Sequence, residues 1–247
     1  MNIIIYKMKK WYLKKTILAI LPLMAASLVF TACGDDDDIK IPDVKPSATG
    51  TMTDSDGNEY KWVRIGNLDW MAESFRGGES WIGQDYVSEN GIMYTLYADN
   101  DEVAEERIQR LGNYYTYQQA LDLCPEGWRL PTDDDWKQLE ITLGMSKSEA
   151  DKTGWRNGAA QLLTQGTEGT DLNFGYAGQL ASYHTASIQE YHVGDYGYFW
   201  SSTINTEVES PCVFIRKISP AVPNKVERSA TDMKYRYLSV RYCRDAR

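Results

Sequence analysis

A short apolar run that leads to a cysteine limits how much of this chain can form a folded domain. Residues 16–29 are mostly apolar, and the segment before Cys33 carries five lysines and no acidic residue. The run is too short to span a bilayer about 30 Å thick, which needs roughly 20 apolar residues. A basic flank, a short apolar core and small residues predict a signal peptide over residues 1–32. Met8, which begins MKKWYLKK, is an alternative start to Met1.

The residues around Cys33 predict a lipid anchor. The stretch FTACG over residues 30–34 resembles a lipobox, in which the cysteine receives diacylglycerol and becomes the first mature residue. The acidic run Asp35 to Asp38 stays solvated and resembles the signal that sends lipoproteins of Bacteroidota to the outer face of the outer membrane. We therefore expect an outer-membrane lipoprotein that faces the cell exterior, with the membrane as a partner. An ordinary cleavage site followed by a spare thiol is the alternative.

The charge of the mature chain argues against nucleic acid as a partner. The whole sequence has 26 basic and 35 acidic residues and a formal charge of −9. Removing the leader takes away five lysines and no acid, which leaves 21 basic residues and a charge of about −14. Phosphate backbones would be repelled by this balance.

Composition divides the mature chain into a tether and one domain. Residues 33–50 mix acids with prolines and have little apolar content, which is typical of a tether. Residues 51–247 are rich in tryptophan and tyrosine and contain no second linker, which indicates one domain. The spacing of Asp54, Asp56 and Asn58 superficially matches a calcium loop. The glycine and glutamate of an EF-hand are missing from their positions, so we expect a hairpin turn there.

Alternation and capping signals predict short strands and two main helices. Strands are expected over residues 49–53, 60–65, 198–202, 212–218 and 237–243, with a further short one through Trp70 and Met71. One helix is expected over 115–123 and a short one over 159–163, and 166–197 reads as a long loop. Another helix begins after Thr132, the N-cap, with Asp133, Asp134 and Asp135 near the positive end of its dipole, so we assign these carboxylates to capping rather than catalysis. Five tryptophans are assigned to the core, namely Trp62, Trp70, Trp128, Trp136 and Trp200.

Five motifs occur in the order found in one family. They are DSDGNEYKWVRIGNLDWMAESFR, Y-x-x-A-x-x-x-C, G-W-R-L-P-T-x-x-x-W, W-S-S-T and V-R-Y-C-R-D. Over roughly Thr51 to Asp245 the chain resembles the Fibrobacter succinogenes major paralogous domain, which is common in cell-surface lipoproteins. The resemblance implies a C-type-lectin-like α+β fold. In that fold two helices pack on short antiparallel sheets beside a long loop region, and the two chain ends lie side by side.

The cysteines predict a disulfide. Three remain besides Cys33, so an oxidising compartment favours one bridge and one spare thiol. The resemblance implies a bridge between Cys124 and Cys243, which would stabilise the domain by roughly 4 kcal/mol in the loop-entropy model. Cys212 is then an apolar residue on a strand. A bridge between Cys212 and Cys243 is left open.

The sequence lacks the common signatures of catalysis. The G-W-R-L-P-T stretch also resembles the formylglycine-generating oxidases, but their pair of closely spaced cysteines is missing. G-x-S-x-G, P-loop and H-E-x-x-H motifs are absent, and neither His184 nor His192 has a helical partner for zinc. W-S-S-T stands where calcium-dependent lectins carry W-N-D, and E-P-N and Q-P-D are absent. We therefore expect no enzyme, no cofactor and no metal site, although paired carboxylates keep a hydrolase open.

Aromatic side chains in the loop of residues 175–198 are the best candidates for a ligand site. Rings with polar tips offer contact area at low entropic cost, although several rings of this kind can equally cover the small sheets. The leading hypothesis is a surface lipoprotein that binds glycan or protein for adhesion or nutrient capture, and the second is a structural component of a surface assembly. The candidate ligand-binding residues are Tyr176, Tyr183, His184, Tyr191, His192 and Tyr196, joined by Trp81 and Tyr86.

Overall fold

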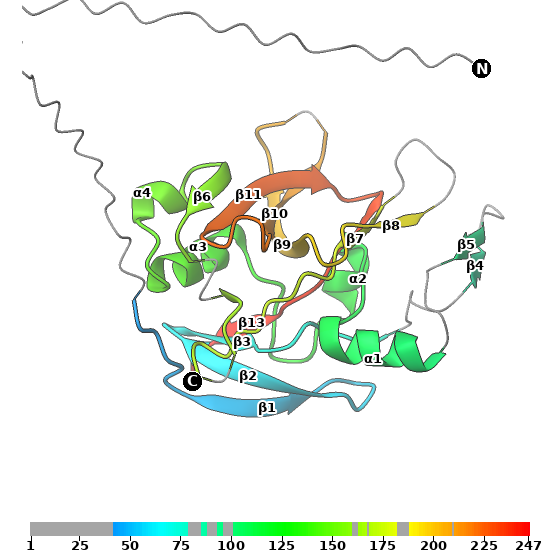
Figure 1. The fold of residues 1–247 in the computed structure, drawn as a ribbon, viewed down its shortest axis with the longest axis horizontal. Helices are drawn as coiled ribbons and strands as arrows, with labels where there is room; N and C mark the ends of the chain where they lie inside the picture. The colour runs from blue at the N-terminus through cyan, green and yellow to red at the C-terminus, as the bar shows by residue number, and fades with distance from the viewer. Residues whose placement is uncertain are drawn as a thin grey trace, which may run out of the picture. The chain divides into compact units, whose positions relative to one another are not determined.

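The computed structural model describes residues 42–78, 85–87, 93–95, 101–159, 163–166, 168–181, 188–208 and 210–247, all in the unit Ile39–Arg247. These residues form a mixed α+β structure of short helices and small antiparallel sheets (Figure 1). No helix among them is long and apolar enough to cross a membrane.

The first sheet joins the two ends of the domain. Its strands are β1 (Thr49–Thr53), β2 (Glu59–Ile65), β3 (Leu68–Met71) and β13 (Cys243–Asp245), and they pair antiparallel in the order β1-β2-β3-β13. The turn between β1 and β2 is held by Asp54, whose carboxylate accepts the backbone N–H groups of Asp56 at 3.0 Å and Asn58 at 2.9 Å. The hairpin turn expected in place of a calcium loop is confirmed.

The second sheet packs one face on a helix. Its strands are β6 (Gly154–Asn157), β11 (Lys225–Asp232), β10 (Cys212–Ile218) and β9 (Gly197–Asn205), antiparallel in the order β6-β11-β10-β9. From this face Arg156 and Arg216 donate to Glu140, and Arg216 and Arg228 donate to Asp133. Glu140 and Asp133 belong to α3 (Asp133–Thr142), so buried ion pairs join that helix to the sheet.

The helices begin where capping chemistry predicts. They are α1 (Asp101–Leu111), α2 (Tyr117–Asp122), α3 and α4 (Lys147–Ala150). Thr132 accepts the backbone N–H of Asp135, whose carboxylate accepts the N–H of Thr132, and a matching capping box starts α2. The two main predicted helices are thus confirmed, whereas α1 and α4 were not predicted. Leu163 donates to the Ala159 carbonyl at 3.0 Å, as the short predicted helix requires, but residues 160–162 lie outside the described part.

The segment predicted as a long loop contains strands of its own. β7 (Gln179–Ala181) pairs with β8 (Gln189–Tyr191) and with β12 (Arg236–Tyr237) in the order β12-β7-β8. A separate pair is formed by β4 (Asp85–Val87) and β5 (Met93–Thr95).

The strand predicted over residues 237–243 is wrong in its middle. Leu238 bridges Tyr115, Ser239 bridges Phe199, and the carbonyl of Val240 accepts the N–H of Phe75 at 2.9 Å. The segment therefore runs between several partners instead of along one. Both the apolar and the polar members of its alternating pattern are buried, because the segment passes through the interior of the domain.

Two large apolar clusters form the interior of the domain. In the first, the Trp70 and Trp136 rings lie 5.1 Å apart, and Phe199 and Cys243 belong to the same cluster. The second surrounds Trp200 and includes residues from β2, β9 and β10 and from the segment 238–242. The second sheet contributes to both clusters, so it lies between them.

Candidate functional site

Only part of the predicted ligand site falls within the described residues. Cys33, Trp81, Tyr183 and His184 lie outside them, and Tyr86 lies in the short strand β4. Tyr176 is half-buried and packs against the first apolar cluster, so the structure assigns it a packing role.

The other predicted residues do come together. The His192 ring lies 6.1 Å from the ring of Tyr191, 5.2 Å from Tyr196 and 6.4 Å from Tyr198, measured between centroids. A tight turn produces this arrangement, because the N–H of Tyr196 donates to the His192 carbonyl at 3.0 Å and His192 adopts a left-handed φ of 65°. His192 itself is exposed. The turn therefore gathers rings from both of its arms.

A row of side chains across the second sheet extends this group of rings. Trp155 pairs with Glu227, Glu227 with Lys217, and Lys217 with Tyr198 in the strand register. Residues directly opposite one another on paired strands share a face of the sheet. The row lies on the face opposite α3, because the neighbouring Arg156, Arg216 and Arg228 point to that helix. We call Trp155, Glu227, Lys217, Tyr198, Tyr196 and His192 the aromatic row.

Lys217 holds the aromatic row together. Its ammonium lies 5.0 Å from the ring centroid of Trp155, 5.2 Å from that of Tyr196 and 5.9 Å from that of Tyr198, and it forms an ion pair with Glu227. Burial, together with the nearby Tyr196 and Glu227, raises the pKa of Tyr198 to about 12, so its phenol stays protonated at neutral pH. Trp155 is 37% exposed. Tyr198 is 8% exposed and belongs to the second apolar cluster, so the accessible rings of the row are those of Trp155, Tyr196 and His192.

Two of the five tryptophans assigned to the core are not in it. Trp70, Trp136 and Trp200 are fully buried, but Trp62 and Trp128 are half-buried. Both rings contact Arg244, which lies far from them in the sequence and so could not be recognised as their partner. The Arg244 guanidinium lies 4.9 Å from the Trp62 ring centroid and 4.5 Å from that of Trp128, so the two indoles pack against a cation.

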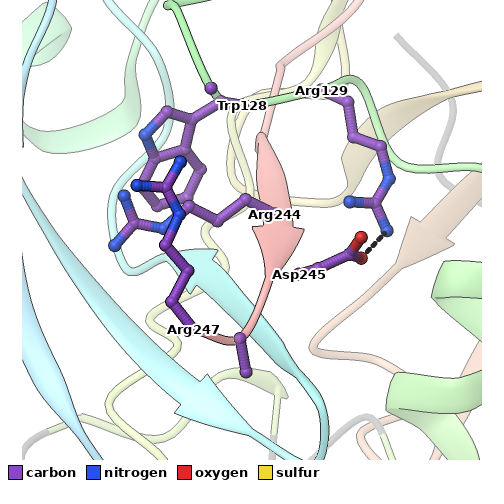
Figure 2. Close-up of a pocket in the computed structure, with 7 residues that line it drawn as sticks. Trp128, Arg129, Arg244, Asp245 and Arg247 are labelled. Carbon is purple, nitrogen blue, oxygen red and sulfur yellow. Dashed lines mark ion pairs between the residues drawn. The ribbon is translucent and has the colours of Figure 1, made fainter.

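A polar hollow lies beside Trp128. It has a volume of about 310 Å³, and a second hollow of about 320 Å³ shares Trp128 and Arg129 with it. Figure 2 shows the Arg244 and Arg247 guanidinium groups next to the Trp128 ring, with Asp245 turned away toward Arg129. The first hollow is lined by Gly127, Trp128, Arg129, Arg244, Asp245, Ala246 and Arg247.

The predicted disulfide is absent. Cys124, Cys212 and Cys243 are free thiols in the structure. Cys243 belongs to the first apolar cluster, with its sulfur 3.9 Å from Asp135 Oδ2, whereas Cys124 packs against the second cluster, with its sulfur 3.8 Å from the Pro125 carbonyl oxygen. The two sulfurs thus face different clusters. Burial raises the pKa of the Cys124 thiol to about 11, which keeps it protonated at neutral pH.

Sequence reasoning missed Trp155, Lys217 and the arginines around Trp128. Alternation within residues 212–218 does place Lys217 opposite its buried neighbours, so one signal was available. The strand that carries Trp155 was not predicted, and its register with β11 follows only from the folded structure.

The fold and its surface features define a class: a small α+β domain that presents aromatic rings and cations on its surface. Residues 63–244 match the model of the Fibrobacter succinogenes major domain, and the chain belongs to this family. No curated protein and no solved structure matches the chain.

Proposed function

We propose that this chain is a cell-surface lipoprotein whose domain binds glycan without catalysing a reaction. The aromatic row is the observation that supports the proposal. Aromatic faces suit the C–H faces of sugar rings, and a side chain with few rotatable bonds loses little entropy on binding. The Lys217 and Glu227 pair lies between the rings of Trp155 and Tyr198, where it can hydrogen-bond sugar hydroxyls.

The finer fold assignment is part of the same proposal. A C-type-lectin-like arrangement has two helices on short antiparallel sheets and adjacent chain ends. Helices α2 and α3 and the pairing of β3 with β13 agree with it. Because folds do not determine ligands, the lectin-like arrangement supports a binding role only together with the aromatic row.

A glycan array tests the proposed function. We expect the full chain in detergent to bind a discrete set of glycans, and Trp155→Ala and Tyr196→Ala each to weaken binding at least tenfold. Tyr235→Ala is the matched control, since Tyr235 is 47% exposed in the turn after β11 and lies outside the row. Circular dichroism confirms that each variant folds. Binding unchanged by both row variants would contradict the role of the row.

A protein ligand or a structural role would give a different result. If the array is blank while pull-down from envelope fractions recovers defined proteins, the domain takes part in a surface assembly. The row variants distinguish two cases. They should abolish capture of a specific protein ligand that binds the row, whereas they should leave an assembly contact elsewhere on the domain unchanged.

The lipid anchor is a second part of the proposal. The FTACG stretch and the acidic run after Cys33 support acylation of that cysteine and exposure on the outer membrane. Metabolic labelling with an alkyne fatty acid should mark the wild-type chain and leave Cys33→Ser unlabelled. Protease treatment of intact cells should degrade the wild-type protein. An intact leader in the mass spectrum of the membrane fraction would contradict the anchor.

A further inference from the structure

The polar hollow beside Trp128 is separate from the aromatic row and has its own chemistry. Three of the residues that line it are arginines, in a protein whose formal charge is −9. The lining has one carboxylate, that of Asp245, and it pairs with Arg129 at 3.0 Å. Successive side chains of a strand point to opposite sides, so Arg244 and Asp245 leave β13 in different directions.

Two guanidinium groups in this hollow have unused donors. Arg244 donates through Nε to Asp69 at 3.0 Å, and within the described residues its two terminal nitrogens make no hydrogen bond. The Arg247 side chain likewise makes none within those residues, and its terminal nitrogen lies over Gly127. Like charges held close together destabilise the free protein, and an anion between them would relieve the repulsion.

Arg244 is fixed in position before any ligand arrives. Its guanidinium lies between the Trp62 and Trp128 rings, and Asp69, which is fully buried, holds its Nε. Gly50 makes room for Trp62, because a Cβ at residue 50 would lie 2.5 Å from the indole ring. A pre-positioned planar guanidinium loses little freedom on binding and offers paired donors that match a carboxylate.

We propose that this hollow binds the carboxylate of an acidic sugar, with Arg244 and Arg247 as its ligands. The net negative charge of the protein opposes binding of dense polyanions, so a carboxylate carried by a uronic acid fits better than a phosphate or sulfate polymer. The exposed donors of the hollow are guanidinium groups, which recognise a carboxylate and ring hydroxyls. The carboxylate of Asp245 in the lining is paired with Arg129, so the side chains of the hollow leave few free acceptors for a peptide backbone.

Isothermal titration with a matched pair of trisaccharides tests this site. The probes are trigalacturonate and α-1,4-galactotriose, in which each carboxylate is replaced by a hydroxymethyl group. We expect the full chain to bind trigalacturonate at least tenfold more tightly, with affinity falling as salt is raised. Arg247→Gln should remove most of this preference, and so should Arg244→Gln.

The controls separate this site from its surroundings. Arg110→Gln removes an exposed arginine on α1 and should leave the preference intact. Tyr235→Ala removes an exposed ring outside both the hollow and the aromatic row and should also leave it intact. The aromatic row is tested separately on the glycan array, so failure here is distinct from failure of the row. Since Arg244 contacts Asp69 and its variant can lose stability, Arg247→Gln is the decisive substitution. Equal affinity for the two trisaccharides, an unchanged preference in Arg247→Gln, or tighter binding of a peptide C-terminal carboxylate would each overturn the proposal.

Discussion

Replacing Glu140 by glutamine tests how strongly the buried ion pairs join α3 to the second sheet. The Glu140 carboxylate accepts Arg156 Nη1 at 2.8 Å, Arg156 Nη2 at 2.7 Å and Arg216 Nε at 2.6 Å. The three side chains are at most 1% exposed. Glutamine keeps the size of the side chain and removes its charge. Arg156 then keeps the Ala150 carbonyl at 2.9 Å, while Arg216 keeps the Asp133 carboxylate at 2.8 Å.

The loss in the free energy of unfolding comes from the buried positive charge that Glu140→Gln leaves unpaired. Removing one partner of a buried ion pair typically destabilises a protein by about 3–5 kcal/mol. Because Arg216 retains a carboxylate and Arg156 does not, we expect a loss near the lower end, about 3 kcal/mol. Domains of ordinary stability have about 5–15 kcal/mol in total, so the variant should unfold much more readily.

Urea unfolding followed by circular dichroism measures this loss. The midpoint should fall while the dependence on urea stays constant. Asp134→Asn is the matched control on the same helix, since Asp134 is 83% exposed and its ion pair with Lys137 should contribute less than about 1 kcal/mol. The double variant Glu140→Met, Arg156→Met should be more stable than Glu140→Gln, because Arg156, the arginine that would lose its carboxylate, is removed while Arg216 and Arg228 keep Asp133. A loss in Glu140→Gln no larger than that of the control would refute the reasoning.

Acid should weaken the same network. Burial opposes ionisation of Asp133, but the hydrogen bonds and positive charges of Arg228 and Arg216 together outweigh it and lower its pKa to about 2. Because folding lowers this pKa, the stability that Asp133 contributes is complete above about pH 4 and is lost as the pH falls toward about 2. The urea midpoint of the wild-type protein should therefore fall over that range. It should fall less in Asp133→Asn, which has no carboxylate to titrate. Arg241→Lys should cost about 2 kcal/mol, measured by the same unfolding assay, because the buried guanidinium donates to three backbone carbonyls and a hydroxyl that an ammonium cannot all reach. Thiol titration of the unfolded chain without reductant should find Cys124 and Cys243 free, and a midpoint that drops on adding reductant would contradict their separation.

Local chemistry explains which parts of the fold were predictable. Thr132 caps α3 through contacts with residues three positions away, so the start of that helix can be read from a few neighbouring letters. The strand over residues 212–218 was predicted with its observed bounds for the same reason, because alternation within one segment marks it. Features of this kind need no knowledge of distant partners.

The parts of the fold and of the site that could not be predicted depend on contacts between residues far apart in the sequence. Trp128 reads as a core residue, yet it is only half-buried at the edge of the second cluster, where Arg244, far along the chain, packs against its ring. Arg241 reads as the polar side of a strand, yet it is 2% exposed because backbone carbonyls from other segments, those of Met71 and Leu172, accept its hydrogen bonds. The aromatic row depends on the pairing of β6 with β11, two strands that lie far apart in the sequence. Hydrophobic periodicity and secondary-structure propensity are local properties, so they cannot predict such pairings.

The pairing of β3 with β13 has a consequence for how the domain is made. β3 ends at Met71, whereas its outer neighbour begins only at Cys243, so during synthesis the edge of β3 stays open until β13 has been made. Contacts between such remote segments form slowly, and an open strand edge invites pairing with other chains in the meantime. Chains cut short before Cys243 should therefore be prone to aggregate, because the pairing of β13 with β3 closes this edge of the sheet.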